Sequence, residues 1–315
     1  YPAALQMIEL GMAREDLTED LRFYGLATKA GVQMSQHEFR QALETAQVAI
    51  RINGHNAMIY GVLADAYVEL GDYANAIKAV DQMVSIRPDL RSYSRVSYIR
   101  ENLGRGEDAI TAMQMAVDAG APGSEEKAWC MLQLAGLYQR KGDLETATSI
   151  SEAILAERPD YPFAIAQLGR LKIQMKDTTA GVKMLEKACS IIPEVSFYVD
   201  LARYHKEAGH IAKADSLSQT ILTMIDGDMR SGHIMDLELG RVYAELFDNY
   251  PKAIQLMQIE YQRRPENIEV NKAMAEVYAK MGDQANAELH LAKVRRLHQV
   301  DELMSANQVQ YAGLK

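Results

Sequence analysis

The stretch AMIYGVLADAYVELGDYANAIKAVDQMVSIRPDL, residues 57–90, contains two helical patterns separated by a Gly-Asp turn. In the first half, apolar or small residues recur at spacings of three and four, which is typical of one face of an α-helix. This face holds Tyr60, Leu63, Ala64, Tyr67 and Leu70. Gly71 can adopt the positive φ that ends a helix, and Pro88 cannot continue a second one. The stretch therefore predicts two short helices joined by a turn at Gly71.

The same landmarks recur about every 34 residues. A turn glycine followed five residues later by an alanine occurs at Gly71 and Ala76, Gly104 and Ala109, Gly142 and Ala147, Gly209 and Ala214, and Gly282 and Ala287. A unit of this length cannot bury its apolar face alone, whereas stacked copies can. We count eight copies, which begin near residues 21, 57, 90, 128, 162, 195, 233 and 268, preceded by a half-repeat at 1–20 and followed by a polar cap helix at about 301–312.

The order of these landmarks resembles the tetratricopeptide repeat family, whose pattern is a large residue, Leu-Gly or Leu-Ala, Tyr, Gly, Ala and a closing Pro. Residues 57–90 supply it as Tyr60, Leu63, Ala64, Tyr67, Gly71, Ala76 and Pro88. The resemblance covers nearly the whole chain and implies an all-α, right-handed superhelical solenoid, here a single array over residues 1–315. It also implies a scaffold or adaptor that binds a protein or peptide in its concave groove. The alternatives are a structural spacer that self-associates and, in a third class, an enzyme with unrecognised chemistry.

A narrower resemblance covers mainly residues 36–175. The segments YGVLADAYVELG (60–71) and IRPDLRSYSRVSYIRE (86–101) are similar to a group of bacterial tetratricopeptide proteins, several of which are exported lipoproteins of the cell envelope. This similarity implies a periplasmic or envelope location, with the cytoplasm as the alternative.

The first residues look like half of a repeat. Residues 3–14 read as a second helix without its first, with Ala4, Ile8 and Gly11 on its inner face. Arrays rarely begin on an uncovered half-repeat, because terminal repeats need a polar outer face. We therefore expect the chain to be part of a longer protein, or the half-repeat to pair with a second copy.

Composition excludes several classes of protein. The chain has 48% hydrophobic and 24% charged residues, which favours a folded protein over a disordered one. It has no run of about 18 apolar residues, so we expect no membrane span. A formal net charge of −9 argues against nucleic acid as a partner. Cys130 and Cys189 lie on different predicted helices and are interpreted as core residues.

Motifs for catalysis and metal binding are missing from the sequence. The seven histidines are scattered and form no HExxH pattern, and there is no CxxC motif, P-loop or Gly-x-Ser-x-Gly elbow. His205 takes the place that tyrosine holds in other repeats, which favours a role in core packing. We expect no catalytic residue, no cofactor and no metal, and hence no enzyme.

Candidate binding residues come from the helix face turned away from the packing stripe. The position two residues after the repeat leucine points towards the inside of a superhelix, and along the array it holds Asp65, Tyr98, Gly136, Arg170, Arg203, Arg241 and Glu276. The three successive arginines can clamp an acidic peptide. The alternative is local pairing, because Asp200 and Glu238 each precede an arginine by three residues.

A second candidate patch comes from the third and fourth copies. It contains Arg91, Ser94, Arg95, Tyr98, Trp129 and Gln133. Arg91 and Arg95 lie one helical turn apart, and arginine beside tyrosine and tryptophan is typical of binding hot spots. This patch is the second place where we expect a peptide ligand.

The recurring alanine predicts a mutational effect. Replacing Ala76 by leucine should overpack the point where two helices cross and lower the free energy of unfolding by about 1–3 kcal/mol. Thermal or denaturant unfolding measures this change, and a variant that unfolds like the parent would show that the repeat register is wrong.

Overall fold

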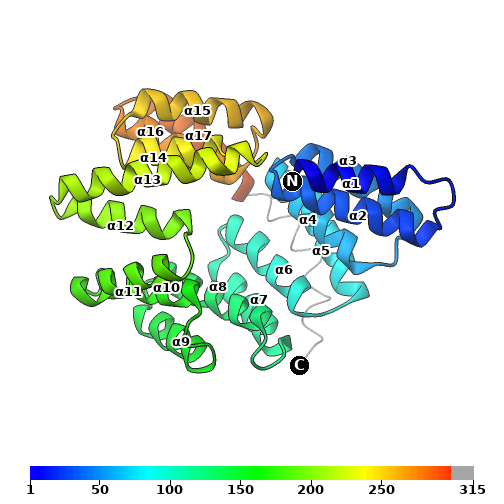
Figure 1. The fold of residues 1–315 in the computed structure, drawn as a ribbon, viewed down its shortest axis with the longest axis horizontal. Helices are drawn as coiled ribbons and strands as arrows, with labels where there is room; N and C mark the ends of the chain where they lie inside the picture. The colour runs from blue at the N-terminus through cyan, green and yellow to red at the C-terminus, as the bar shows by residue number, and fades with distance from the viewer. Residues whose placement is uncertain (299–315) are drawn as a thin grey trace.

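A computed structural model describes residues 1–298 and consists there of α-helices joined by short connections (Figure 1). The first helix is α1 (Pro2–Met12), and sixteen further helices follow within the described residues. They are α2 (Glu19–Ser35), α3 (Phe39–Ile52), α4 (Ala57–Leu70), α5 (Tyr73–Ile86), α6 (Leu90–Asn102), α7 (Gly106–Ala119), α8 (Glu125–Lys141), α9 (Leu144–Glu157), α10 (Pro162–Gln174), α11 (Thr178–Ile191), α12 (Val195–Glu207), α13 (Ile211–Arg230), α14 (Asp236–Glu245), α15 (Tyr250–Arg263), α16 (Ile268–Lys280) and α17 (Gln284–His298). The expected all-α, right-handed solenoid is confirmed.

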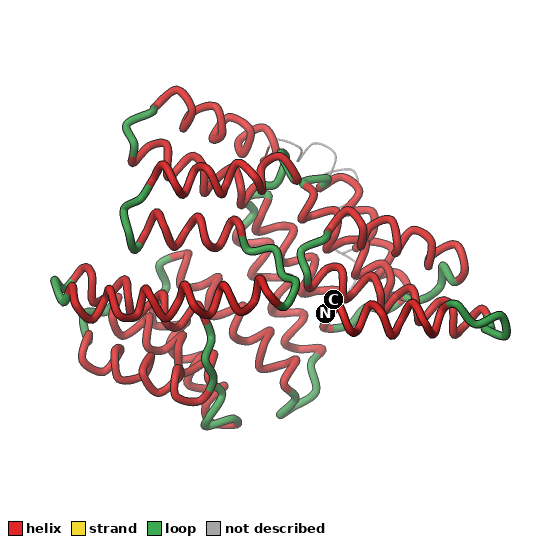
Figure 2. The backbone as a smooth tube through the Cα atoms, turned by 45° about the horizontal axis from the view of Figure 1, so that its top comes forward, coloured by secondary structure: helices red, strands yellow, loops and turns green. Residues whose placement is uncertain are grey.

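Consecutive helices pack as pairs, from α2 with α3 to α16 with α17, and each pair packs on the next. Figure 2 shows the pairs as parallel layers joined by loops at their ends. In the middle of the array, α6, α8 and α10 lie towards the inside of the curve, and α7, α9 and α11 lie outside (Figure 1). We assign each pair from α2 onwards as one repeat.

The turn and crossing residues behave as the sequence indicates. Ala76 and Ala147 are fully buried where the paired helices meet. Gly71 ends α4 with a φ of +82°, and Asp72 then caps α5 by accepting a hydrogen bond from the backbone N–H of Asn75 at 3.2 Å. Lys176 replaces the glycine in its repeat and is held at a φ of +71°, a conformation that costs a side-chain-bearing residue about 1–2 kcal/mol.

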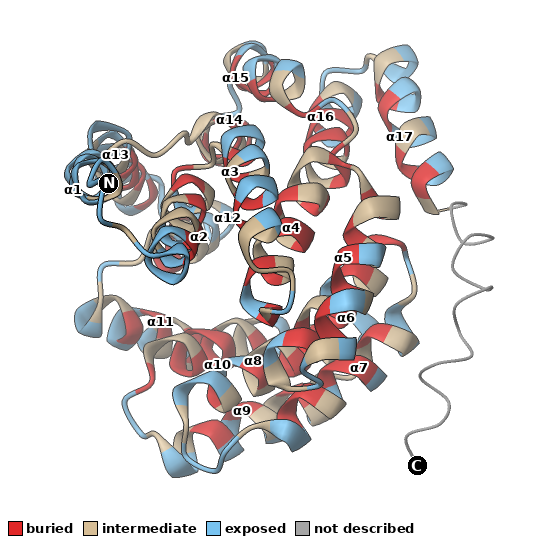
Figure 3. Ribbon diagram, turned by 90° about the vertical axis from the view of Figure 1, so that its right-hand side faces the viewer, coloured by how far each residue is buried: buried red, intermediate tan, exposed pale blue. Residues whose placement is uncertain are grey.

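The two ends of the array meet. Residues of α2–α5 contact residues around α14–α17 that lie nearly 200 positions further along the chain. The end of α4 meets the start of α16, and Figure 3 shows α4 below α16. The backbone N–H of Ile234 donates to the carbonyl of Gln36 at 3.2 Å, and Arg263 donates to the carbonyl of His37 at 2.9 Å. The superhelix is therefore a closed ring, and we call this contact region the closure.

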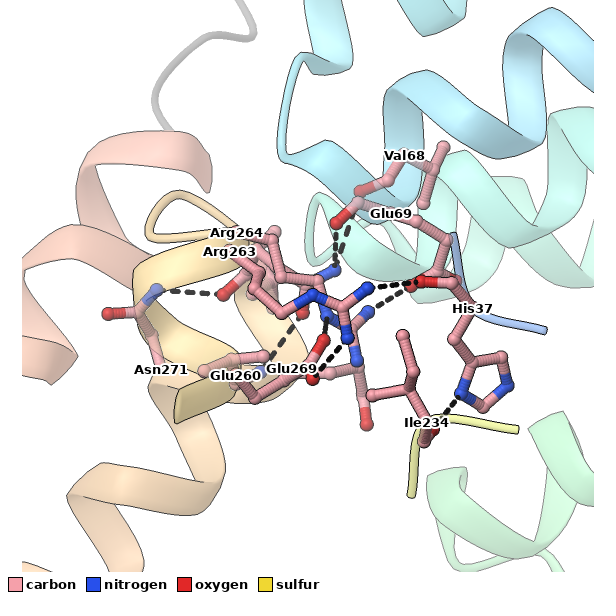
Figure 4. Close-up of polar contacts among 12 residues, drawn as sticks. His37, Val68, Glu69, Ile234, Glu260, Arg263, Arg264, Glu269 and Asn271 are labelled. Carbon is pink, nitrogen blue, oxygen red and sulfur yellow. Dashed lines mark hydrogen bonds and ion pairs between the residues drawn. The ribbon is translucent and has the colours of Figure 1, made fainter. Parts of the chain in front are cut away.

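An ion-paired arginine lies at the centre of the closure (Figure 4). Arg264 is only 5% exposed and forms ion pairs with Glu260 on its own helix and with Glu69 on α4. Burial raises the pKa of Glu69, and Arg264 opposes that shift. Because a buried charge without a partner is strongly destabilising, Glu69 and Arg264 depend on each other across the ring.

Apolar packing supports the same contact. Ile268, Val294 and Leu297 from the last repeat belong to one buried cluster with residues of α2–α7. At the first position of α16, the Ile268 N–H donates to the Tyr73 hydroxyl at 3.2 Å. Gly71 packs so tightly on the last repeat that an added Cβ would lie 2.3 Å from the backbone carbonyl carbon of Glu266.

The beginning of the chain differs from expectation in detail. α1 has no buried residue; Ala4 and Gly11, expected on its inner face, are exposed, whereas Leu5, Ile8 and Met12 are partly covered. Gly25 of α2 receives Met12, since an added Cβ would collide with the Met12 sulfur. The inner face of α1 is thus shifted by about one residue. The expected cap helix at 301–312 lies outside the described residues.

Two glycine substitutions distinguish the cost of backbone strain in a turn from the effect of a clash at the closure. Gly71 and Gly142 both have positive φ, but an added Cβ at Gly142 meets no neighbouring atom within 4 Å. Gly71→Ala and Gly142→Ala should each cost about 1–2 kcal/mol in turn strain. Only Gly71→Ala should also open the ring, seen as a larger radius of gyration in small-angle scattering. If both variants keep the parent dimensions, the closure does not depend on this contact.

Candidate functional site

A groove lies on the inner side of the array between α6 and α8. It has a volume of about 790 Å³ and extends from Asp65 on α4 to Phe163 at the start of α10. This size suits several side chains of a peptide or a small molecule. We call it the α6/α8 groove.

Aromatic side chains form much of its surface. Trp129 of α8 and Tyr98 of α6 are 45% and 42% exposed, although both are large and apolar. Tyr161 and Phe163 line the far end, with ring centroids 5.6 Å apart. Phe163 is held in turn by an edge-to-face contact with Phe197 at 5.5 Å. The groove therefore offers aromatic surface from a supported framework.

A two-pronged ion pair lies at the near end. Arg95 donates from Nε and Nη2 to the two carboxylate oxygens of Asp65, at 2.9 and 2.7 Å, and from Nη1 to the Arg91 carbonyl at 3.0 Å. Burial lowers the pKa of Arg95, but Asp65 outweighs this and raises it above the ordinary value. Gly61 makes room for this arrangement, because an added Cβ would lie 3.2 Å from the guanidinium.

The other two arginines of the groove are also paired. Arg91 contacts Glu126 of α8 at 3.4 Å, and Arg140 of α8 pairs with Glu101 of α6. Both pairs join neighbouring repeats across the groove. They lie among the residues that line the groove, and two of the aromatic side chains of the same groove stay exposed.

The three arginines expected to form a ladder bind carboxylates of the next inner helix. Arg170 pairs with Asp200 at 2.8 Å, Arg203 with Glu245 at 2.7 Å, and Arg241 with Glu269 at 2.8 Å. The local pair also occurs between Arg203 and Asp200, at 3.5 Å. Arg203 and Arg241 line a second, smaller pocket of about 310 Å³. These contacts link successive repeats, and a ligand-binding role for the ladder stays a prediction.

The structure brings the second patch together. Arg91, Ser94, Arg95, Tyr98, Trp129 and Gln133 all line the α6/α8 groove. Arg203 and Arg241 lie in the separate pocket, and Arg170 lines neither. Sequence reasoning missed Tyr161 and Phe163, which flank Pro162 at the start of α10. Their aromatic character was the available signal, but only the curvature of the array shows that they face α8.

His205, Cys130 and Cys189 lie in or near the packed core. His205 is buried, its pKa is lowered by burial, and its Nδ1 lies 3.2 Å from that of His210. Cys130 and Cys189 are free thiols, and burial raises the pKa of Cys130 to about 12. Within residues 1–298, no group of three or more potential ligands is placed to hold a metal ion. None of the helices described here is sufficiently long and apolar to span a membrane.

Comparison with known families agrees with the helix pairing. Two tetratricopeptide repeat models match the chain, one over residues 33–103 and the other over residues 164–195. These two segments therefore match tetratricopeptide repeats, and the solenoid of helix pairs extends on both sides of them.

Individual relatives share the repeat and the fold. The small glutamine-rich tetratricopeptide repeat-containing protein 2 of Saccharomyces cerevisiae is 25% identical over 112 residues, which is 35% of this chain and 32% of the yeast protein. The human IFIT1 dimer solved with m7Gppp-AAAA is 16% identical, with a TM-score of 0.55 over 89% of this chain and 72% of that one. Pseudomonas aeruginosa PilF is 12% identical, with a TM-score of 0.52 over 66% and 94%. At these identities the structural matches show the fold alone.

Trp129, the only tryptophan of the chain, gives a direct test of the groove. Because its indole is half exposed, acrylamide should quench its fluorescence in the folded protein. Collisional quenching of the native and the guanidinium-unfolded protein measures this accessibility. An emission that acrylamide quenches only after unfolding would mean that the groove is closed.

Proposed function

We propose that the protein is a non-enzymatic scaffold that binds a linear segment of a partner protein in the α6/α8 groove. The observation that carries this proposal is the exposure of both Trp129 and Tyr98 in one groove on the inner side of the array. Large aromatic side chains are costly to leave in water, and in interfaces they supply much of the binding energy. The repeat fold, which presents extended concave surfaces, supports the same reading.

The shape of the ring supports a segment rather than a folded domain as the ligand. The closure joins the two ends of the array, so the inner surface is not an open cradle that can spread around a globular partner. An extended peptide needs only the width of the groove. Preformed walls also reduce the ordering cost of binding on the scaffold side.

A peptide selection tests the proposal, because it can be carried out before any partner is identified. Peptides selected from a random phage-displayed library should quench or shift Trp129 fluorescence when added as synthetic, tryptophan-free versions. The Trp129→Ala variant should bind them about 30-fold more weakly, as expected for a hot-spot aromatic. Because this variant has no tryptophan, its binding is measured with a fluorescently labelled peptide.

Tyr24→Ala provides the matched control. Tyr24 of α2 is 53% exposed and lies outside the groove, so its removal changes exposed aromatic surface without touching the proposed site. This variant should bind the peptides like the parent. Selected peptides that bind Trp129→Ala as tightly as the parent would contradict the groove as the binding site.

A further inference from the structure

The charges of the α6/α8 groove constrain which peptide it accepts. Its three arginines, Arg91, Arg95 and Arg140, are each paired with a carboxylate of a neighbouring helix. An acidic ligand would have to displace one of these carboxylates, and the displaced group would remain nearby. For Arg95 the exchange would break two hydrogen bonds to Asp65, of 2.9 and 2.7 Å.

The side chains that line the groove carry one more carboxylate than guanidinium group. Four carboxylates line the groove, from Asp65, Glu101, Glu125 and Glu126, against the three guanidinium groups. Among residues 1–298, Glu125 is the groove carboxylate that has no cationic side chain bound to it. The whole chain has a formal net charge of −9, so the long-range field has the same sign.

Glu125 lies beside the aromatic part of the groove. It is in the first turn of α8, one turn before Trp129, on the same helix face. Burial raises the pKa of the Tyr161 hydroxyl and the Glu125 carboxylate raises it further, so Glu125 also lies near Tyr161. Arg158, whose guanidinium carbon lies 5.5 Å from the Tyr161 ring centroid, opposes this shift. Glu125 and Trp129 thus present a carboxylate and an aromatic ring to the same groove from one face of α8.

We infer that the α6/α8 groove selects a peptide segment in which a large apolar or aromatic residue stands next to a lysine or arginine. This inference rests on the function proposed above and names its ligand. The apolar side chain packs between Trp129 and Tyr98, and the basic side chain pairs with Glu125. The inferred charge of this ligand is opposite to that of the acidic peptide expected at the arginine ladder, whose role stays a prediction.

Reversal of the charge at Glu125 in the protein and at the basic residue of the peptide tests the inference. The probes are the tryptophan-free peptides selected on the parent protein, each also synthesised with its basic residue replaced by glutamate. The basic peptides should bind Glu125→Lys about tenfold more weakly than the parent. The glutamate versions should bind the parent weakly and recover at least part of their affinity on Glu125→Lys.

Glu145→Lys is the matched control. Glu145 is likewise an exposed acidic residue in the first turn of a helix, α9, and the same net charge change there should leave both peptide sets unaffected. Selected peptides that are acidic, or basic peptides that bind Glu125→Lys like the parent, would overturn the ligand class while leaving the groove as the binding site. Failure to obtain peptides that depend on Trp129 would instead overturn the proposed function.

Discussion

Arg264 is enclosed where the two ends of the array meet, and the closed shape of the ring depends on the neutralisation of its charge by carboxylates from both ends. Glu260 is supplied by the same helix, but Glu69 comes from α4, nearly 200 residues earlier in the chain. In the closed ring, removal of Glu69 would leave Arg264 buried without its cross-ring partner, and the loss of one member of a buried ion pair is strongly destabilising. In an open repeat array each repeat contacts only its neighbours, whereas here the terminal repeats also stabilise each other.

Ion pairs between arginine and carboxylate side chains also occur on the inner surface, where they join neighbouring repeats. Arg95, Arg170, Arg203 and Arg241 each reach a carboxylate on an adjacent inner helix, so ion pairs join successive repeats along the concave side. Because these arginines are already paired, they contribute orientation rather than free positive charge. Trp129 and Tyr98 are instead exposed in the groove, and this is why they, rather than the arginine ladder, define the site that we propose.

Much of the fold follows from local sequence signals, and the closure does not. Gly71, Ala76 and Pro88 each act within one repeat, so their spacing predicts helix pairs and their stacking. The contact of Gly71 with Glu266 depends instead on the small rotation between repeats summed over the whole array, which no local pattern encodes. Arg91 and Trp129 could be placed together because they come from neighbouring repeats, and Asp200 could be named as a local partner of Arg203. Glu245 and Glu269, the partners of Arg203 and Arg241 on the next inner helix, could not.

The claim that the array closes on itself is tested most directly by hydrogen exchange of the Ile268 backbone amide. As the first residue of α16, Ile268 has no intrahelical acceptor, and its partner is the Tyr73 hydroxyl across the closure. In a closed ring this amide should be protected, unlike that of Ile211, which holds the same position at the exposed start of α13. Protection that is lost in Tyr73→Phe would support the account. Exchange of Ile268 as fast as that of Ile211 in the parent protein would contradict it.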